Sequence, residues 1–276
     1  THIIPVVTDF NIFFQMGGVL SLLLVFRTNS AYDRFWEARR QLGALVKICR
    51  SLARITAYTS QDSESKERVR LLLTVFPRLL VSHLEGDFTM QPEIVSVMGL
   101  RSMDTRMILA SRNRPFRCIQ LIGDVINEDL AGDAVERSLV GGLIAEMLEV
   151  LGNCERIVGC PVPLAYSRHT SRFLSFFTLT LPLVLIPQLG WVTVFLHTLS
   201  SWAMYGIDEI GHVIENPFDS EVSQDLLAIS TIHNSIESDA QDALSFLYMS
   251  DRVGKDEEES EFPRAEDDVP PGVFIG

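Results

Sequence analysis

Residues Phe173 to Ile207 read FLSFFTLTLPLVLIPQLGWVTVFLHTLSSWAMYGI, a run of 35 residues without Asp, Glu, Lys or Arg. A single membrane-spanning helix needs roughly 20 predominantly apolar residues. The segment PQLG (Pro187–Gly190) interrupts the run near its middle, so two short spans joined by a tight turn fit it better than one. The sequence therefore predicts a transmembrane helical hairpin over residues 171–208. The alternative is a hairpin buried inside a large soluble protein.

The charges that flank this run predict its orientation. Arg168 and Arg172 precede it, and Asp208 and Glu209 follow it. Both ends of a hairpin emerge on the same side, and basic residues next to membrane spans favour the cytoplasmic side. We therefore expect both ends of the hairpin to emerge on the cytoplasmic side.

A second apolar block, FNIFFQMGGVLSLLLVF (Phe10–Phe26), ends at Arg27. It is just long enough to span a bilayer, and we assign residues 1–27 to this membrane segment. In a helix, Gly18, Leu22 and Phe26 share one face. Their spacing leaves two interpretations open, a packing stripe or the lining of a pore. Since one span plus a hairpin would leave the termini on opposite sides, we expect a first membrane helix to precede this segment.

Residues 28–170 are predicted to form a helical region outside the membrane. Apolar residues recur with a helical period after Arg27, so the membrane helix is expected to continue into water. Its other face carries basic residues: Arg27, Arg34, Arg39, Arg40, Lys47, Arg50 and Arg54. These are either a solvated face near lipid headgroups or a field that concentrates anions at a pore entrance.

Further helices are expected along the rest of the chain. One starts at Gln61 with Ser60 as its N-cap and runs towards Leu84. Breaks are expected at two prolines, Pro92 and Pro115, and the remaining helices are predicted over Phe116–Leu130, Ala134–Val158 and Asp219–Tyr248. The last of these occupies a C-terminal segment, residues 209–250. Residues 251–276 hold nine acidic and three basic residues and are predicted to be a disordered tail, either inert or regulatory.

Composition excludes several functional classes. The net charge of −13 argues against nucleic-acid binding, which requires a basic surface. The four cysteines include no CxxC pair, and the histidines are scattered, so no metal site and no metal cofactor are predicted. No nucleophile elbow, P-loop or zinc-protease motif occurs. The acidic pairs Asp208/Glu209 and Glu215/Asp219 are expected to form interface salt bridges and solvated helix ends instead of a catalytic dyad. We therefore expect no enzyme and no catalytic residues.

Three strings occur in a diagnostic order: LLLVFRTNSAYDRFWEAR (Leu22–Arg39), GNCER followed by CPVPLAY (Gly152–Tyr166), and IENPF followed by SQDLL (Ile214–Leu227). Together with the apolar blocks, they make the chain resemble the bestrophin family, in its bacterial, plant and algal branch, which includes the thylakoid voltage-dependent chloride channel type. The resemblance covers most of the chain from Phe10 to Tyr248. It implies an all-α membrane subunit of a homopentamer with one central anion pore.

The resemblance also implies which residues line that pore. Gly18, Leu22 and Phe26 correspond to a narrow hydrophobic neck, although Gly18 replaces the bulkier apolar residue often found there. Val135 corresponds to a second constriction at the cytosolic end. Arg27, which directly follows the neck, is expected to provide the charge at the pore entrance.

The expected partners are chloride and other monovalent anions, including bicarbonate, together with the lipid bilayer. Calcium regulation is not expected, because DSEVSQD (Asp219–Asp225) offers only three carboxylates, whereas a calcium site takes six to eight oxygen ligands. A non-conducting membrane scaffold is the alternative function. The protein is expected to be a multi-pass membrane protein, in the thylakoid membrane if its source is a photosynthetic eukaryote.

Overall fold

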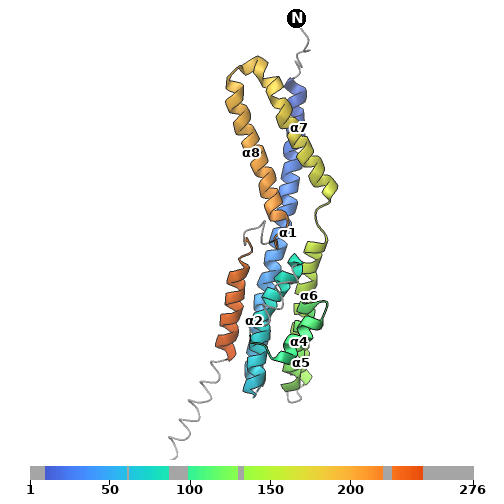
Figure 1. The fold of residues 1–276 in the computed structure, drawn as a ribbon, viewed down its shortest axis with the longest axis vertical. Helices are drawn as coiled ribbons and strands as arrows, with labels where there is room; N and C mark the ends of the chain where they lie inside the picture. The colour runs from blue at the N-terminus through green and yellow to red at the C-terminus, as the bar shows by residue number, and fades with distance from the viewer. Residues whose placement is uncertain (1–9, 61, 87–98, 130–133, 220–225, 245–276) are drawn as a thin grey trace, which may run out of the picture.

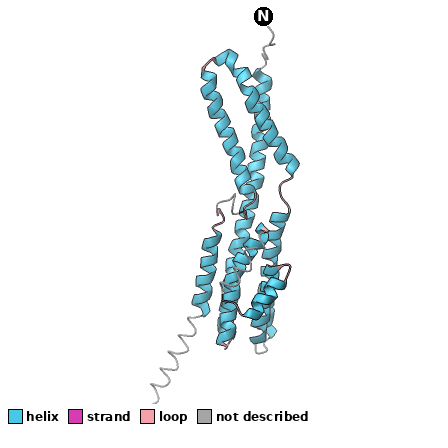
Figure 2. Ribbon diagram, in the orientation of Figure 1, coloured by secondary structure: helices cyan, strands magenta, loops and turns pink. Residues whose placement is uncertain are grey.

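The protein is an elongated assembly of helices in the computed structural model, which describes residues 10–60, 62–86, 99–129, 134–219 and 226–244. No strand occurs in these ranges (Figure 2). The predicted all-α class is therefore confirmed.

One long helix, α1 (Phe10–Thr59), joins the two ends of the molecule. Its 50 residues correspond to a length of about 75 Å at 1.5 Å per residue. The helix passes without a break from the apolar block into the basic segment, as the continuous period predicted. Beside its first half lie α7 (Leu164–Leu189) and α8 (Val192–Glu215), which form the upper part of the molecule (Figure 1).

The lower part surrounds the second half of α1. It contains α2 (Ser63–Glu85), α4 (Ser102–Ala110), α5 (Arg114–Asp129), α6 (Ala134–Gly159) and a last helix over residues 229–244. α6 rises from the lower end towards the start of α7 (Figure 1). α1 and α2 both pack against α6, and α5 packs against α2 and α6. The large core in this part contains Phe76, Leu79 and Ile122.

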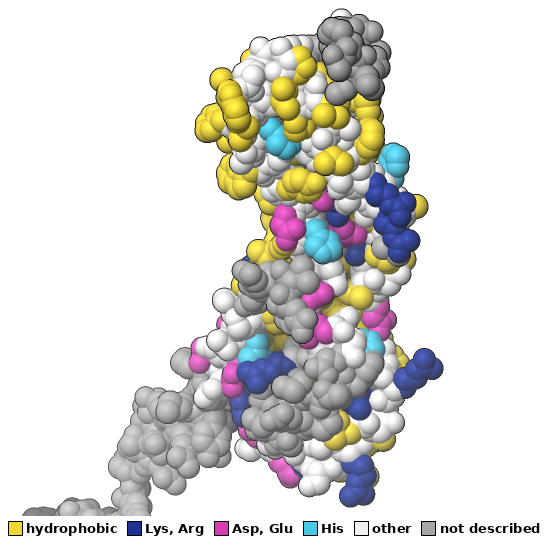
Figure 3. Space-filling model, turned by 45° about the horizontal axis from the view of Figure 1, so that its top comes forward, with side chains coloured by type: hydrophobic (Ala, Val, Ile, Leu, Met, Phe, Trp, Pro, Cys, Tyr) yellow, Lys and Arg dark blue, Asp and Glu magenta, His cyan; other side chains and the backbone are white. Residues whose placement is uncertain are grey.

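The upper part has only a small core, made of Leu20, Leu24, Leu174 and Phe177. Most of its large apolar side chains point outwards, including Leu179 (77% exposed) and Trp202 (75% exposed). Figure 3 shows them gathered over this end of the molecule, with charged side chains beginning below. An apolar exterior around helices that satisfy their own backbone hydrogen bonds suits a lipid environment.

By length and hydropathy, one helix segment in the described ranges is suited to cross a bilayer, Ala165–Leu189, with a mean hydropathy of 1.5. Its partner α8 follows after a turn at Gly190, which has a positive φ of 54°. The predicted hairpin is present, and its turn at Gly190 lies three residues beyond Pro187, at the end of the PQLG segment. Residues 171 and 208, the predicted hairpin limits, fall inside α7 and α8.

Two predicted helix starts were wrong. Asp62, not Ser60, caps α2, because its carboxylate accepts hydrogen bonds from the backbone N–H groups of Glu64 and Ser65. The last helix starts at residue 229 and not at Asp219. α8 ends in a turn in which the Asp219 N–H donates to the Asn216 carbonyl, and Ala228 has a positive φ of 51°, which a right-handed helix cannot accommodate.

The lower core contains several buried reactive or polar groups. Burial raises the pKa of the Cys49 and Cys154 thiols to about 12, and that of Cys118 further. Burial and the nearby Arg78 lower the pKa of His233. Each of these groups is therefore held in its neutral form, which is the form that a dry interior favours. Cys160 is exposed.

Candidate functional site

Along most of its length, one face of α1 is not covered by any other described helix of the protomer. The last helix reaches this face at Arg50, which pairs with Asp239. α8, α7, α6 and α2 pack against the opposite face. The uncovered stripe follows the helical repeat and contains Phe14, Gly18, Leu22, Val25, Phe26, Asn29, Asp33, Trp36, Arg40, Gly43, Lys47, Arg50 and Arg54. It changes from apolar in the upper part to polar and then basic in the lower part.

The three predicted neck residues lie on this stripe. Leu22 is 55% and Phe26 is 56% exposed. A Cβ atom added to Gly18 would meet no atom within 4 Å. Their side of α1 is therefore open in the protomer, and their part in a constriction stays a prediction.

Val135 is 74% exposed at the start of α6, near the lower end of the molecule. It lies far from the neck residues along the long axis, as the expected second constriction requires. Its part in such a constriction stays a prediction too.

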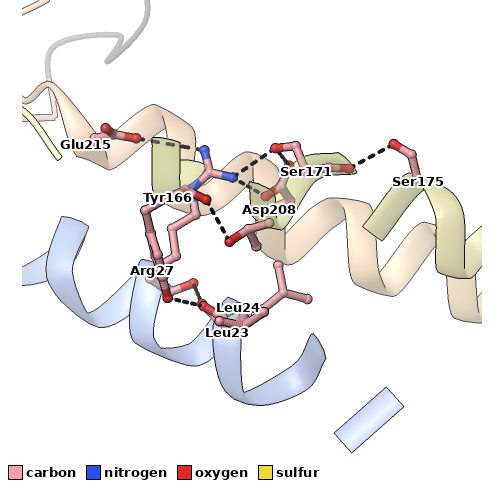
Figure 4. Close-up of polar contacts among 10 residues, drawn as sticks. Leu23, Leu24, Arg27, Tyr166, Ser171, Ser175, Asp208 and Glu215 are labelled. Atoms are coloured by element: carbon pink, nitrogen blue, oxygen red, sulfur yellow. Dashed lines mark hydrogen bonds and ion pairs between the residues drawn. The ribbon is translucent and has the colours of Figure 1, made fainter. Parts of the chain in front are cut away.

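Arg27 lies in a buried polar cluster between α1, α7 and α8 (Figure 4). Its guanidinium is ion-paired with Asp208 and lies 3.8 Å from the Glu215 carboxylate. Ser171 Oγ donates to Asp208 at 3.4 Å, and Tyr166 donates to the Leu23 carbonyl at 3.0 Å. The cluster therefore fastens both helices of the hairpin to α1.

The expectation that Arg27 provides the charge at the pore entrance needs correction for the protomer. The residue is only 5% exposed and points to the side of α1 opposite the uncovered stripe. Successive residues of a helix are about 100° apart, so Arg27 turns inwards although its neighbour Phe26 points outwards. A buried arginine of this kind requires paired carboxylates, and Asp208 and Glu215 provide them.

The interface salt bridges expected for Asp208 and Glu215 are confirmed. Their separation of seven residues places both on one face of α8. Gly211 lies between them and faces α1, where an added Cβ would make an ordinary van der Waals contact with Thr28 Oγ1 at 3.7 Å. Tyr166 and Ser171 also belong to this cluster, and neither was predicted from the sequence to do so. The spacing of Tyr166, Thr170 and Ser175 along α7 was the available signal, since hydroxyl groups in an apolar helix indicate a packed face.

No group of three or more His, Cys, Asp or Glu side chains within the described ranges is arranged to hold a metal ion. Of the segment in which calcium binding was considered, only Asp219 belongs to those ranges. The acidic tail at residues 251–276 also lies outside them.

The apolar exterior of α7 and α8, the long connecting helix and the polar cluster at their junction define an all-helical membrane protein. The chain belongs to the bestrophin family: the model of the Bacterial/Fungal Bestrophin protein matches residues 2–242.

The chain is similar to several channel proteins. It is 34% identical to a voltage-dependent anion channel-forming protein of Nostoc sp. over 236 residues, which cover 82% of this chain and 75% of the relative. It is 31% identical to the chloroplastic voltage-dependent chloride channel 1 of Arabidopsis thaliana, covering 88% of this chain and 58% of the relative. A crystal structure of a point variant of a bacterial bestrophin homologue from Klebsiella pneumoniae has 25% identity and a TM-score of 0.81, covering 89% of this chain and 90% of the homologue.

Proposed function

We propose that this chain is a subunit of an anion channel, in which five copies bring the uncovered stripes of their α1 helices together around a central pore. The stripe itself carries this proposal. It runs along most of a 50-residue helix, and a straight pore needs a continuous lining of this kind. The names of the Nostoc and Arabidopsis relatives support anion conduction, and the latter names chloride.

The upper part of the stripe supports a hydrophobic neck. Gly18, Leu22 and Phe26 offer no charge and no side-chain hydrogen bond to a passing ion. An anion must therefore shed part of its hydration shell there, and weakly hydrated anions lose less free energy in doing so. We expect permeability to increase as anion hydration weakens.

The lower part of the stripe supports an electrostatic role. Arg40 lies 13 residues after Arg27, and Arg54 lies 27 residues after it. At 1.5 Å per residue, these two arginines are about 20 and 40 Å further along α1 than Arg27. The headgroup layer extends only several ångströms beyond the hydrocarbon core. Of the two interpretations of the basic face, the anion-concentrating field is therefore favoured for these residues. Arg50 contributes less to this positive field, because its guanidinium is paired with the Asp239 carboxylate at 2.7 Å.

The proposed pore is tested by variants that widen its neck, because a wider neck should increase conductance. Leu22→Ala and Phe26→Ala should each raise the single-channel conductance of the reconstituted oligomer in planar bilayers. Phe195→Ala, which truncates a 69% exposed side chain on α8 away from the stripe, is the matched control and should leave conductance unchanged. If both α1 variants and the control give the same conductance as the wild type, α1 does not line the pore.

Two alternative functions are distinguished by the same recordings. A bicarbonate channel would use the same stripe, and replacing chloride by bicarbonate in the same recordings separates the two anions. A non-conducting scaffold would give no current from a correctly assembled oligomer.

We further propose conduction without calcium. Currents that disappear on chelation and return with micromolar calcium would contradict this. In a photosynthetic eukaryote we expect the thylakoid membrane, because two of the similar proteins are named chloroplastic. Fractionation of isolated chloroplasts tests that location.

A further inference from the structure

A cavity of about 560 Å³ opens where α1, α7 and α8 meet below the apolar part of the hairpin. Its wall is strongly basic. The charged or titratable side chains that line it are Arg27, Arg34, Arg168, Arg172, His212, Glu215 and Asp219.

The arginines of this cavity are not neutralised to the same extent. Arg27 is paired with carboxylates. Arg34 is held by backbone carbonyls, including those of Glu215 at 3.0 Å and Ile157 at 2.6 Å, which fix its position without cancelling its charge. Arg168 and Arg172 are exposed, lie one turn apart on α7, and take part in none of the ion pairs found among the described residues. The cavity therefore carries an excess of positive charge.

Two polar atoms of the lining are buried without a hydrogen-bond partner among the described residues, Arg27 Nε and Ser167 Oγ. The Arg27 side chain is only 6% exposed, and its Nε–H group is buried. Buried donors are normally paired, and an unpaired one reduces stability. Both residues line the cavity, so an acceptor bound there is a candidate partner for these two groups.

The position of the cavity indicates what that acceptor is. Arg172 is the last charged residue before the uncharged run that starts at Phe173, so the cavity lies at the level of the headgroups when the hairpin spans a bilayer. Basic pockets between membrane helices on this side suit lipid phosphates. Arginine pairs with phosphate through two parallel N–H donors.

We propose that this cavity binds the phosphate group of an anionic lipid headgroup. Arg168 and Arg172 hold the phosphate from α7, while Arg27 Nε–H and Ser167 Oγ–H donate to its oxygens. The Glu215 carboxylate faces the same cavity and accepts from a headgroup hydroxyl, which makes phosphatidylglycerol the suitable probe. Free phosphate offers the same anion chemistry. The site is separate from the uncovered stripe of α1.

Binding is measured on the purified oligomer in neutral detergent, by thermophoresis, with three probes: short-chain phosphatidylglycerol, phosphatidylcholine with matched acyl chains, and inorganic phosphate. We expect phosphatidylglycerol to bind more tightly than phosphatidylcholine. The double variant Arg168→Gln/Arg172→Gln should weaken phosphatidylglycerol binding about 30-fold. The control Arg106→Gln/Arg112→Gln removes the same charge from two exposed residues that do not line the cavity and should change the affinity little.

Ser167→Asp is an independent variant, which places a carboxylate where a phosphate oxygen is expected and should also abolish the preference for phosphatidylglycerol. If inorganic phosphate alone binds as tightly and responds to the same variants, the site is a phosphate site supplied from solution. Equal wild-type affinities for phosphatidylglycerol, phosphatidylcholine and inorganic phosphate would overturn the proposal. So would equal losses in the cavity variant and the control.

Discussion

Replacing Asp208 by Asn removes the ion-pair partner of Arg27 and leaves its guanidinium inside the helix junction. The two side chains are 6% and 19% exposed. Removing one member of a buried pair costs about 3–5 kcal/mol, because the remaining charge stays desolvated. Glu215, at 3.8 Å, compensates in part, so we expect a loss near the lower end, about 3 kcal/mol. For a chain of this size that corresponds to a decrease in Tm of roughly 6–12 °C.

The assay is thermal unfolding of the detergent-purified oligomer, followed by circular dichroism. Asp239→Asn is the matched control, since it breaks the Arg50–Asp239 pair, whose side chains are 55% and 33% exposed, and exposed pairs contribute about 1 kcal/mol or less. The double variant Arg27→Met/Asp208→Leu should regain part of the loss, because it removes the unpaired guanidinium and leaves only Glu215, whose side chain is 19% exposed, without its cationic partner. If Asp208→Asn lowers Tm no more than Asp239→Asn does, the cluster does not fasten the hairpin to α1.

Three further predictions concern packing, thiols and pH. Gly17→Ala should be about 1 kcal/mol or more less stable than Gly18→Ala in the same melts, because a Cβ at Gly17 would lie 3.2 Å from the Phe177 ring; equal stabilities would contradict this packing. Iodoacetamide should label one thiol per native chain, Cys160, and all four only after denaturation; a second native adduct by mass spectrometry would show that a buried cysteine is accessible. The lowered pKa of His233 means that the unfolded chain binds a proton near pH 6.5 and the folded chain does not, so stability should fall as pH decreases below about 6.5. His233→Gln should make stability depend less steeply on pH in this range. An unchanged pH dependence would show that other groups cause it.

The overall helix pattern could be predicted from sequence because each element has a local signal. The charge-free run from Phe173 to Ile207 predicted the hairpin, and the unbroken apolar period after Phe10 predicted one continuous α1. Helix ends were harder to predict. Ser60 and Asp62 are both good capping residues, and only the backbone geometry, with Asp62 extended at φ −87° and ψ 118°, selects between them.

For the functional site, the sequence predicts which residues share one side of α1, but not which other helices pack against that helix. The spacing of Gly18, Leu22 and Phe26 places them together, and the structure leaves that side of α1 uncovered. The direction of Arg27 could not be predicted in the same way. Its partner Asp208 is 181 residues away along the chain, and local periodicity carries no information about which distant helix packs against which side. The unpaired Arg27 Nε and Ser167 Oγ likewise become visible only once α1 and α7 are assembled.

The central claim is that copies of this chain enclose a path for anions along α1. It is tested most directly by the reversal potential of the reconstituted oligomer under a potassium chloride gradient, followed by replacement of chloride with nitrate and then with a large organic anion. We predict a reversal potential near the chloride equilibrium potential, which shifts with each anion replacement and not when sodium replaces potassium. A reversal potential that follows the cation, or the absence of current from an intact oligomer, would contradict the account.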